Sequence, residues 1–191
     1  MATIKRHIFY RPMTQGGEDV LLSGDVWSDG QTPTSQLRTE AKSQHLSCFA
    51  GGMVAIGAKI FDNAHELAVA RKLVDGCIWG YETSNLGILP EIMHTVPCED
   101  QSQCPWDQYR WQHEVDQAFP DDKTPAEEKI QARRLPPGVS QIDNTRYILR
   151  YAGLTGHLII LSPWQISSPL FRSCRMHISG SMADLVQARG D

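Results

Sequence analysis

The chain has 191 residues, of which 41% are hydrophobic and 21% charged, a composition that suits one globular domain and excludes a disordered or fibrous chain. Its formal net charge of -4 comes without a basic cluster that could follow a phosphate backbone, so nucleic acid is not an expected partner. No stretch reaches the roughly 18 uninterrupted apolar residues of a membrane helix, so we expect no membrane segment in this chain.

The five cysteines are an odd number, so in an oxidising compartment at least one is unpaired or paired between chains. Cys174 is the expected leftover. Cys98 and Cys104 have the wrong spacing for a Cys-x-x-Cys motif but suit a small disulfide-closed loop, which implies a secretory compartment. Residues 1–7 lead into no apolar stretch of signal-peptide length. We therefore expect that the true start is missing or that the cysteines stay reduced.

The first elements are short. Ile4 and Ile8 lie one helical turn apart in residues 2–10, which is typical of the end of an amphipathic helix, here without an N-terminal cap. Residues 19–24 are expected to form a short strand, and residues 28–43 a polar surface loop rich in Gly, Pro, Ser and Thr.

Residues 44–60 carry apolar side chains at spacings of three and four, which predicts a helix with that face buried. These residues are Leu46, Phe49, Met53, Ile56 and Ile60. Gly51, Gly52 and Gly57 would each weaken a helix by about 1 kcal/mol relative to alanine, so we expect them to admit a closely packed neighbouring backbone.

A second helix is expected to begin near Asn63, which has Glu66 at capping-box spacing. Its predicted buried stripe comprises Leu67, Ala70, Val74, Cys77, Ile78 and Tyr81. The connection between the two helices is short, so they should fold back as an antiparallel hairpin. This hairpin would bring Cys48 near Cys77, and we predict a disulfide between them.

Beyond a turn at residues 87–91, residues 95–143 are expected to form a long irregular excursion. One short helix at 125–134 should interrupt it, because Thr124, Pro125 and Glu127 combine an N-cap, a first-position proline and a third-position glutamate. Another helix is expected to start after Asp143 or Asn144. Four of the aromatic residues in this half of the chain could stack on sugar faces or form a small satellite core. They are Trp106, Tyr109, Trp111 and Trp164.

Several polar residues are candidates for catalysis, metal binding or ligand binding. His45, Cys48 and Cys77 could be zinc ligands, or His45 and Cys48 a nucleophilic pair, whereas the simpler interpretation is a core histidine beside packed or disulfide-bonded cysteines. Glu91 follows a rigid turn, where partial desolvation could raise its pKa and let it donate a proton; otherwise it is a solvated surface glutamate. Arg150 could orient a sugar hydroxyl or a carboxylate, or lie exposed on a helix.

Taken together, four groups of residues resemble consecutive landmarks of glycoside hydrolase family 47, the class I α-1,2-mannosidases. The groups are His45-Leu46-x-Cys48-Phe49, Cys77, Gly-x-x-Pro-Glu at 87–91, and Arg146-Tyr147-Ile148-Leu149-Arg150. The resemblance implies an all-α fold, a partial (α/α)7 toroid sector of helical hairpins with a short β element. It covers residues 1–150 as part of a catalytic domain and leaves residues 151–191 as an unmatched tail, for which we expect a misread exon or frameshift.

The resemblance also implies roles for individual residues. Glu91 matches a catalytic acid, His45 a histidine of the sugar pocket, and Arg150 the arginine of an Arg-Pro-Glu motif, while Cys48 and Cys77 match a structural disulfide. The implied activity is an inverting α-1,2-mannosidase that trims mannose from high-mannose N-glycans of glycoproteins. The implied location is the endoplasmic reticulum, the Golgi or outside the cell, and the implied cofactor is calcium.

The sequence departs from the family pattern directly after Arg150. Tyr151 and Ala152 stand where the family has proline and a catalytic glutamate, and an inverting glycosidase needs two carboxyl groups roughly 6.5–9.5 Å apart. The family's calcium depends on a threonine in a C-terminal segment that residues 151–191 do not match. We therefore expect a chain without activity and with exposed apolar hairpin faces. Its rivals are a non-catalytic glycan-binding relative and an unrelated Cys-His hydrolase.

Overall fold

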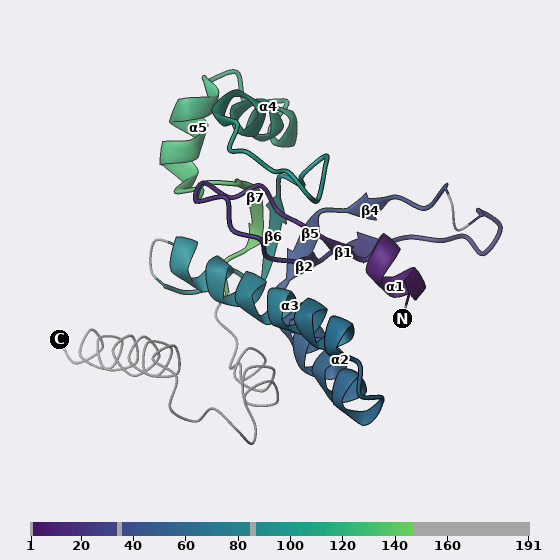
Figure 1. The fold of residues 1–191 in the computed structure, drawn as a ribbon. Helices are drawn as coiled ribbons and strands as arrows, with labels where there is room; N and C mark the ends of the chain where they lie inside the picture. The colour runs from purple at the N-terminus through teal and green to yellow at the C-terminus, as the bar shows by residue number, and fades with distance from the viewer. Residues whose placement is uncertain (1, 34–35, 85–86, 147–191) are drawn as a thin grey trace.

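The computed structural model describes residues 2–33, 36–84 and 87–146 of the chain (Figure 1). The helices are α1 (Ala2–His7), α2 (Phe49–Ile60), α3 (Ala64–Thr83), α4 (Gln108–Ala118) and α5 (Ala126–Arg133), with the 3-10 helix η2 (His45–Cys48) directly before α2. The strands are β1 (Phe9–Tyr10), β2 (Leu22–Ser23), β3 (Asp25–Val26), β4 (Thr39–Glu40), β5 (Lys42–Gln44), β6 (Ile92–Thr95) and β7 (Val139–Asn144). The prediction of an all-α class is therefore too narrow, because these residues form a mixed fold of helices and three small antiparallel sheets.

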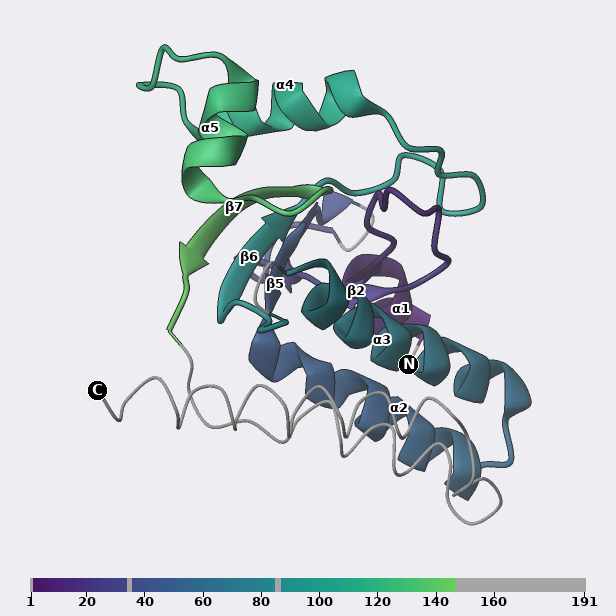
Figure 2. The ribbon, with the colours of Figure 1, turned by 90° about the vertical axis from the view of Figure 1, so that its left-hand side faces the viewer.

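Helices α2 and α3 form the predicted antiparallel hairpin and lie side by side in both ribbon views (Figures 1 and 2). Asn63 caps α3, since its side chain accepts a hydrogen bond of 3.1 Å from the Glu66 amide. The Glu66 carboxylate does not complete the capping box, because it pairs with Lys5 of α1. The hairpin thereby also anchors the N-terminal helix.

The predicted buried face of α2 is wrong. Its large apolar side chains Phe49, Met53, Ile56 and Ile60 are between 46% and 70% exposed. The buried residues of α2 are small: Gly51, Gly52, Val54, Ala55 and Ala58. The small residues form the interface with α3 because they let the two helix backbones approach each other closely. A Cβ added to Gly51 would lie 2.7 Å from the Val74 Cγ2 atom, whereas a Cβ added to Gly57 would have no atom of the described residues within 4 Å.

The stripe predicted for α3 fits its packing better. Ala70, Val74 and Cys77 are buried, and the helix also buries Leu73 and Trp79. On another side of α3, Gly76 meets the segment that leads into β2, where an added Cβ would overlap the Leu21 carbonyl oxygen. The Leu21 amide in turn donates to the Lys72 carbonyl at 3.0 Å. The hairpin is thus fitted against backbone on both sides of α3.

The N-terminal strands are shorter than the sequence suggested. The predicted helix at 2–10 ends at His7 and continues into β1, which pairs antiparallel with β2. The predicted strand at 19–24 corresponds to β2, and the predicted loop at 28–43 contains β4, which pairs with β3.

The side chain of Tyr10 in β1 is bonded to β6. The Tyr10 hydroxyl forms a hydrogen bond of 2.8 Å with the Thr95 Oγ1 atom, and burial raises the pKa of Tyr10 above its ordinary value.

Strands β5, β6 and β7 form a three-stranded antiparallel sheet with β6 in the centre. Neither β6 nor β7 was predicted. Strand β6 alternates half-buried and buried residues, with Met93 and Thr95 facing the core. In this register Gln44 of β5 pairs with Ile92 of β6, and Ile92 pairs with Asn144 of β7. The sheet therefore brings together three segments that are far apart in sequence.

Helices α4 and α5 lie together above this sheet (Figure 2). The prediction of an irregular chain at 95–143 missed α4, which Asp107 caps by accepting from the Arg110 amide at 3.0 Å. The Trp111 Nε1–H donates to the Val139 carbonyl at 2.8 Å and so fixes α4 to β7. The predicted helix at 125–134 exists as α5.

The N-cap of α5 is Pro125 and not the predicted Thr124. The Thr124 side chain instead bonds Asp122 at 2.7 Å. This bond, the Thr124 amide and the Arg133 guanidinium lower the pKa of Asp122 to about 2. Thr124 thus stabilises the turn before the helix rather than the helix end.

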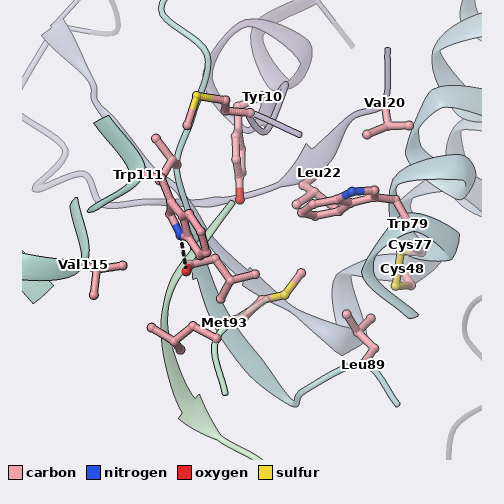
Figure 3. Close-up of a cluster of buried hydrophobic side chains, with 14 residues drawn as sticks. Tyr10, Val20, Leu22, Cys48, Cys77, Trp79, Leu89, Met93, Trp111 and Val115 are labelled. Carbon is pink, nitrogen blue, oxygen red and sulfur yellow. Dashed lines mark hydrogen bonds between the residues drawn. A yellow bond between two sulfur atoms is a disulfide. The ribbon is translucent and has the colours of Figure 1, made fainter. Parts of the chain in front are cut away.

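The main core lies between the sheet, α3 and α4 (Figure 3). Its labelled members include Leu22, Trp79, Leu89, Met93 and Trp111, with the Cys48–Cys77 disulfide at the edge next to α3. A second disulfide, Cys98–Cys104, closes the small loop predicted from the sequence. No helix among the described residues is both long enough and apolar enough to span a membrane.

Candidate active site

His45 stands at the junction of the sheet and the helical hairpin. It directly follows β5 and is the first residue of η2, and only 2% of its surface is exposed. Its amide donates a hydrogen bond of 2.9 Å to the Glu91 carbonyl. The sheet therefore joins the backbones of two residues that the sequence had proposed separately as site residues.

Both the backbone amide and the backbone carbonyl of Glu91 form hydrogen bonds. It comes one residue before β6, and its amide donates to the Asn144 carbonyl of β7 at 2.9 Å. The turn that leads to it contains Gly87 with a φ of 63°, a conformation that glycine adopts without steric cost. The Glu91 side chain is half-buried, in keeping with a carboxylate at the edge of a core.

Tyr81 completes the group from the side of α3. Its hydroxyl hydrogen-bonds the His45 Nε2 atom, and the two rings meet edge to face with centroids 5.7 Å apart. The sequence placed Tyr81 on the buried stripe of α3 but not in the site. A signal was present: Tyr81 lies one turn after Cys77, and His45 lies one turn before Cys48, so the disulfide that joins the cysteines also brings the other two residues together.

The disulfide between Cys48 and Cys77 removes two of the alternatives. Its sulfur atoms are covalently bonded across a Cα–Cα distance of 5.9 Å. Neither cysteine is then a thiolate, which is the form that binds zinc or attacks a substrate. Cys48 is therefore a structural residue here, and His45 is a buried histidine bonded to Tyr81.

Other predicted site residues lie elsewhere. Arg150 and Trp164 fall outside the described residues. Trp106 and Trp111 pack together with ring centroids 5.4 Å apart and belong to the core around α4, which favours the satellite-core interpretation. Tyr109 is 85% exposed on α4. Residues 147–150 of the helix predicted after Asn144 also lie outside the described residues. At the end of the described residues, the Asn144 Oδ1 atom accepts a hydrogen bond of 2.9 Å from the Arg146 amide.

The chemistry of the Glu91 and His45 side chains suits a polar ligand. A carboxylate can accept hydrogen bonds from sugar hydroxyls or donate a proton when protonated, and a buried imidazole whose partner is fixed has a defined tautomer. Across residues 2–33, 36–84 and 87–146 there is no group of three or more His, Cys, Asp or Glu side chains that could hold a metal ion. The described part of the site is therefore a carboxylate and a histidine on a rigid sheet edge.

Known proteins resemble this chain over different lengths. The family model of Glycosyl hydrolase family 47 matches residues 1–151. Two curated relatives, each a probable mannosyl-oligosaccharide alpha-1,2-mannosidase 1B, come from Neosartorya fischeri and Aspergillus fumigatus. Each is 45% identical over 49 residues, which are 26% of this chain and 10% of the relative. A third, mannosyl-oligosaccharide alpha-1,2-mannosidase IA of Spodoptera frugiperda, is 42% identical over 55 residues, 27% of this chain and 8% of that protein. The matching part thus spans a tenth or less of the length of these relatives.

Proposed function

Because the chain belongs to glycosyl hydrolase family 47, we propose that His45 and Glu91 form part of a mannose-binding site of the α-1,2-mannosidase type. The ligand is the terminal α-1,2-linked mannose of a high-mannose N-glycan, free or on a glycoprotein. The observation that supports this proposal best is the hydrogen bond of 2.9 Å between the His45 amide and the Glu91 carbonyl. It keeps the two predicted site residues together on one rigid edge.

Each residue has a distinct part in the proposed site. Glu91 is the acidic residue, which in an active family member would donate or accept a proton at the glycosidic bond. His45 lines the sugar pocket, with Tyr81 as the residue that positions its imidazole. Arg150 would contact the sugar from the segment that follows β7.

We further propose that this chain binds its glycan without releasing mannose. An inverting glycosidase needs a second carboxyl group that works with the first across the scissile bond. Ala152 occupies the position of the family's glutamate after Arg150, and its methyl group can neither ionise nor accept a proton. The proposed activity is therefore that of a mannosidase relative that retains recognition and has lost hydrolysis.

The α2–α3 hairpin is proposed to be one helical hairpin of the (α/α)7 toroid. Residues 1–150 would then be a sector of the catalytic domain, and residues 151–191 a separate tail. The antiparallel packing of α2 on α3 supports this arrangement.

Calcium is implied by the family, where it helps to hold the sugar and the attacking water. The residues present do not fit it by themselves, because no suitable group of acidic, histidine or cysteine side chains occurs in the part that the structure describes. No step of the proposed function depends on the ion. The secretory pathway is the proposed location, supported by the two disulfides, which persist in oxidising compartments.

The test measures binding and hydrolysis separately on the full chain. Titration with a high-mannose oligosaccharide in a calorimeter should give binding, while chromatography of the same mixture should show no released mannose. Glu91→Gln should weaken binding about 10- to 100-fold, since hydrogen bonds to charged groups contribute about 1.5–3 kcal/mol. Glu82→Gln, an exposed neighbour of Tyr81 on α3, is the matched control and should bind like the parent chain.

Two results would count against the proposal. Mannose release above the level of a boiled sample would disprove the loss of hydrolysis and make the enzyme interpretation correct. Absence of glycan binding by a chain with a cooperative unfolding transition would disprove the recognition site itself.

A further inference from the structure

Helix α2 is apolar on two opposite sides, and only one side is packed among the described residues. The small side contacts α3 through residues such as Gly51 and Ala55. The other side, which we call the outer face of α2, consists of Leu46, Phe49, Met53, Ile56, Ile60 and Phe61, all between 46% and 81% exposed. A helix that is apolar all round is normally buried all round.

The outer face is too continuous to be ordinary surface. Single exposed apolar residues are common on proteins, but contiguous patches of several hundred Å² mark sites of interaction. Phe49, Met53, Ile56 and Ile60 follow one another at spacings of four, three and four residues, so they form one stripe along the helix. The single charged residue of α2 is Lys59. The outer face therefore requires an apolar partner.

We propose that residues 151–191 of the same chain cover the outer face of α2. The described part ends two strands away from the residue that precedes η2, because Asn144 of β7 pairs with Ile92, which pairs with Gln44, the residue before His45. Two strand spacings are about 10 Å, so the chain leaves the sheet close to the start of η2. Helix α2, with 12 residues, is about 18 Å long, a length that the 41 residues from 151 to 191 can readily follow.

The sequence of this tail has the pattern of a complementary partner. Phe171, Cys174, Ile178, Met182 and Leu185 recur at spacings of three and four, the pattern of one apolar helical face. Gln187 and Ala183 fall on the opposite side of that pattern. Burial of two apolar faces against each other removes both from water.

A tethered partner is favoured over a second copy of the chain. A segment tethered to its site by the same chain meets that site at an effective concentration that can approach the millimolar range, far above the micromolar concentration of a second molecule in a typical sample. Pairing within the chain should therefore outcompete dimerisation through the same face.

Photo-cross-linking of the full chain tests this contact. p-Benzoylphenylalanine would replace Met53 in one sample and Ile56 in a second, with Tyr109 on α4 as the exposed control position. We expect cross-links within the monomer that mass spectrometry maps to residues 151–191, and few or none from position 109. Products of dimer size whose yield rises with protein concentration would overturn the proposal in favour of a second copy. Yields at 53 and 56 no higher than at 109 would overturn it in favour of an uncovered face.

A paired substitution provides the second measurement. Ile178→Asp with Leu185→Asp should abolish the cross-links from position 53. The matched control, Ala183→Asp with Gln187→Asp, makes the same change in charge on the opposite side of the predicted helix and should retain them. Retention in both pairs, or loss in both, would contradict a contact through this apolar stripe.

Discussion

The hydrogen bond between His45 and Tyr81 is the most specific contact of the candidate site. It joins the first residue of η2 to α3, close to the Cys48–Cys77 disulfide. Since the His45 ring is almost fully buried, its nitrogen needs a partner inside the protein. This pair therefore contributes to stability and sets the orientation of the imidazole in the proposed pocket.

Tyr81→Phe should destabilise the chain by about 1 kcal/mol, the usual net contribution of one hydrogen bond. Urea unfolding measures this change, and the ¹⁵N shifts of the His45 ring report whether its tautomer changes. Tyr109→Phe is the control, because the Tyr109 side chain is 85% exposed and its change should stay within about 0.5 kcal/mol. Equal effects of the two variants would show that the hydroxyl of Tyr81 has no special partner.

At the scale of elements, the hairpin depends on how closely α3 approaches its neighbours. Gly76 leaves no space for a side chain, because an added Cβ would overlap the Leu21 carbonyl. Gly57 of α2 has open space on the same criterion. The two glycines therefore have opposite reasons to be in their helices, although the sequence treats them alike.

Gly76→Ala should lower the free energy of unfolding by about 1–3 kcal/mol, as overpacking usually does. Gly57→Ala should raise it by up to about 1 kcal/mol, since alanine is the better helix former and its Cβ would meet no atom of the described residues. The midpoints of urea denaturation of the two variants measure both effects. A stable Gly76→Ala protein would mean that α3 and the segment before β2 are further apart than the structure has them.

At the scale of the whole molecule, the disulfides decide which parts of the chain are tied together. Cys48–Cys77 closes the hairpin over a sequence separation of 29 residues, and Cys98–Cys104 closes a small loop over 6. The small loop is also bound to the N-terminal segment, because Arg11 donates to the Gln101 carbonyl at 3.0 Å. The fifth cysteine, Cys174, lies outside the described residues.

Thiol titration of the chain in denaturant without reductant should therefore give one reactive thiol, and titration after reduction should give all five. Ellman's reagent measures both values, and peptide mapping would assign the single thiol to Cys174. Three thiols before reduction would show that one disulfide does not form. A value of zero would show that Cys174 is paired between chains.

Local sequence patterns by themselves determined the helical hairpin and its ability to bring Cys48 close to Cys77. Spacings of three and four, the Asn63 cap and a short connection act over a few residues, so they can be interpreted without knowledge of the rest of the chain. The same holds for His45 and Glu91 as site candidates, which a local motif singles out. Arg150 lies outside the described residues.

Only the tertiary structure decided which side of α2 is buried, because both sides are apolar and the choice depends on the fit against α3. It also decided the pairing of β5, β6 and β7, since partners that lie far apart in sequence leave no local pattern in short strands. The backbone hydrogen bond between His45 and Glu91 follows from that pairing, whereas the contact of His45 with Tyr81 follows from the packing of η2 on α3. The sequence thus determined the family and the hairpin, whereas long-range packing brings together the residues of the proposed site, because they come from a sheet edge and a helix that no short segment contains.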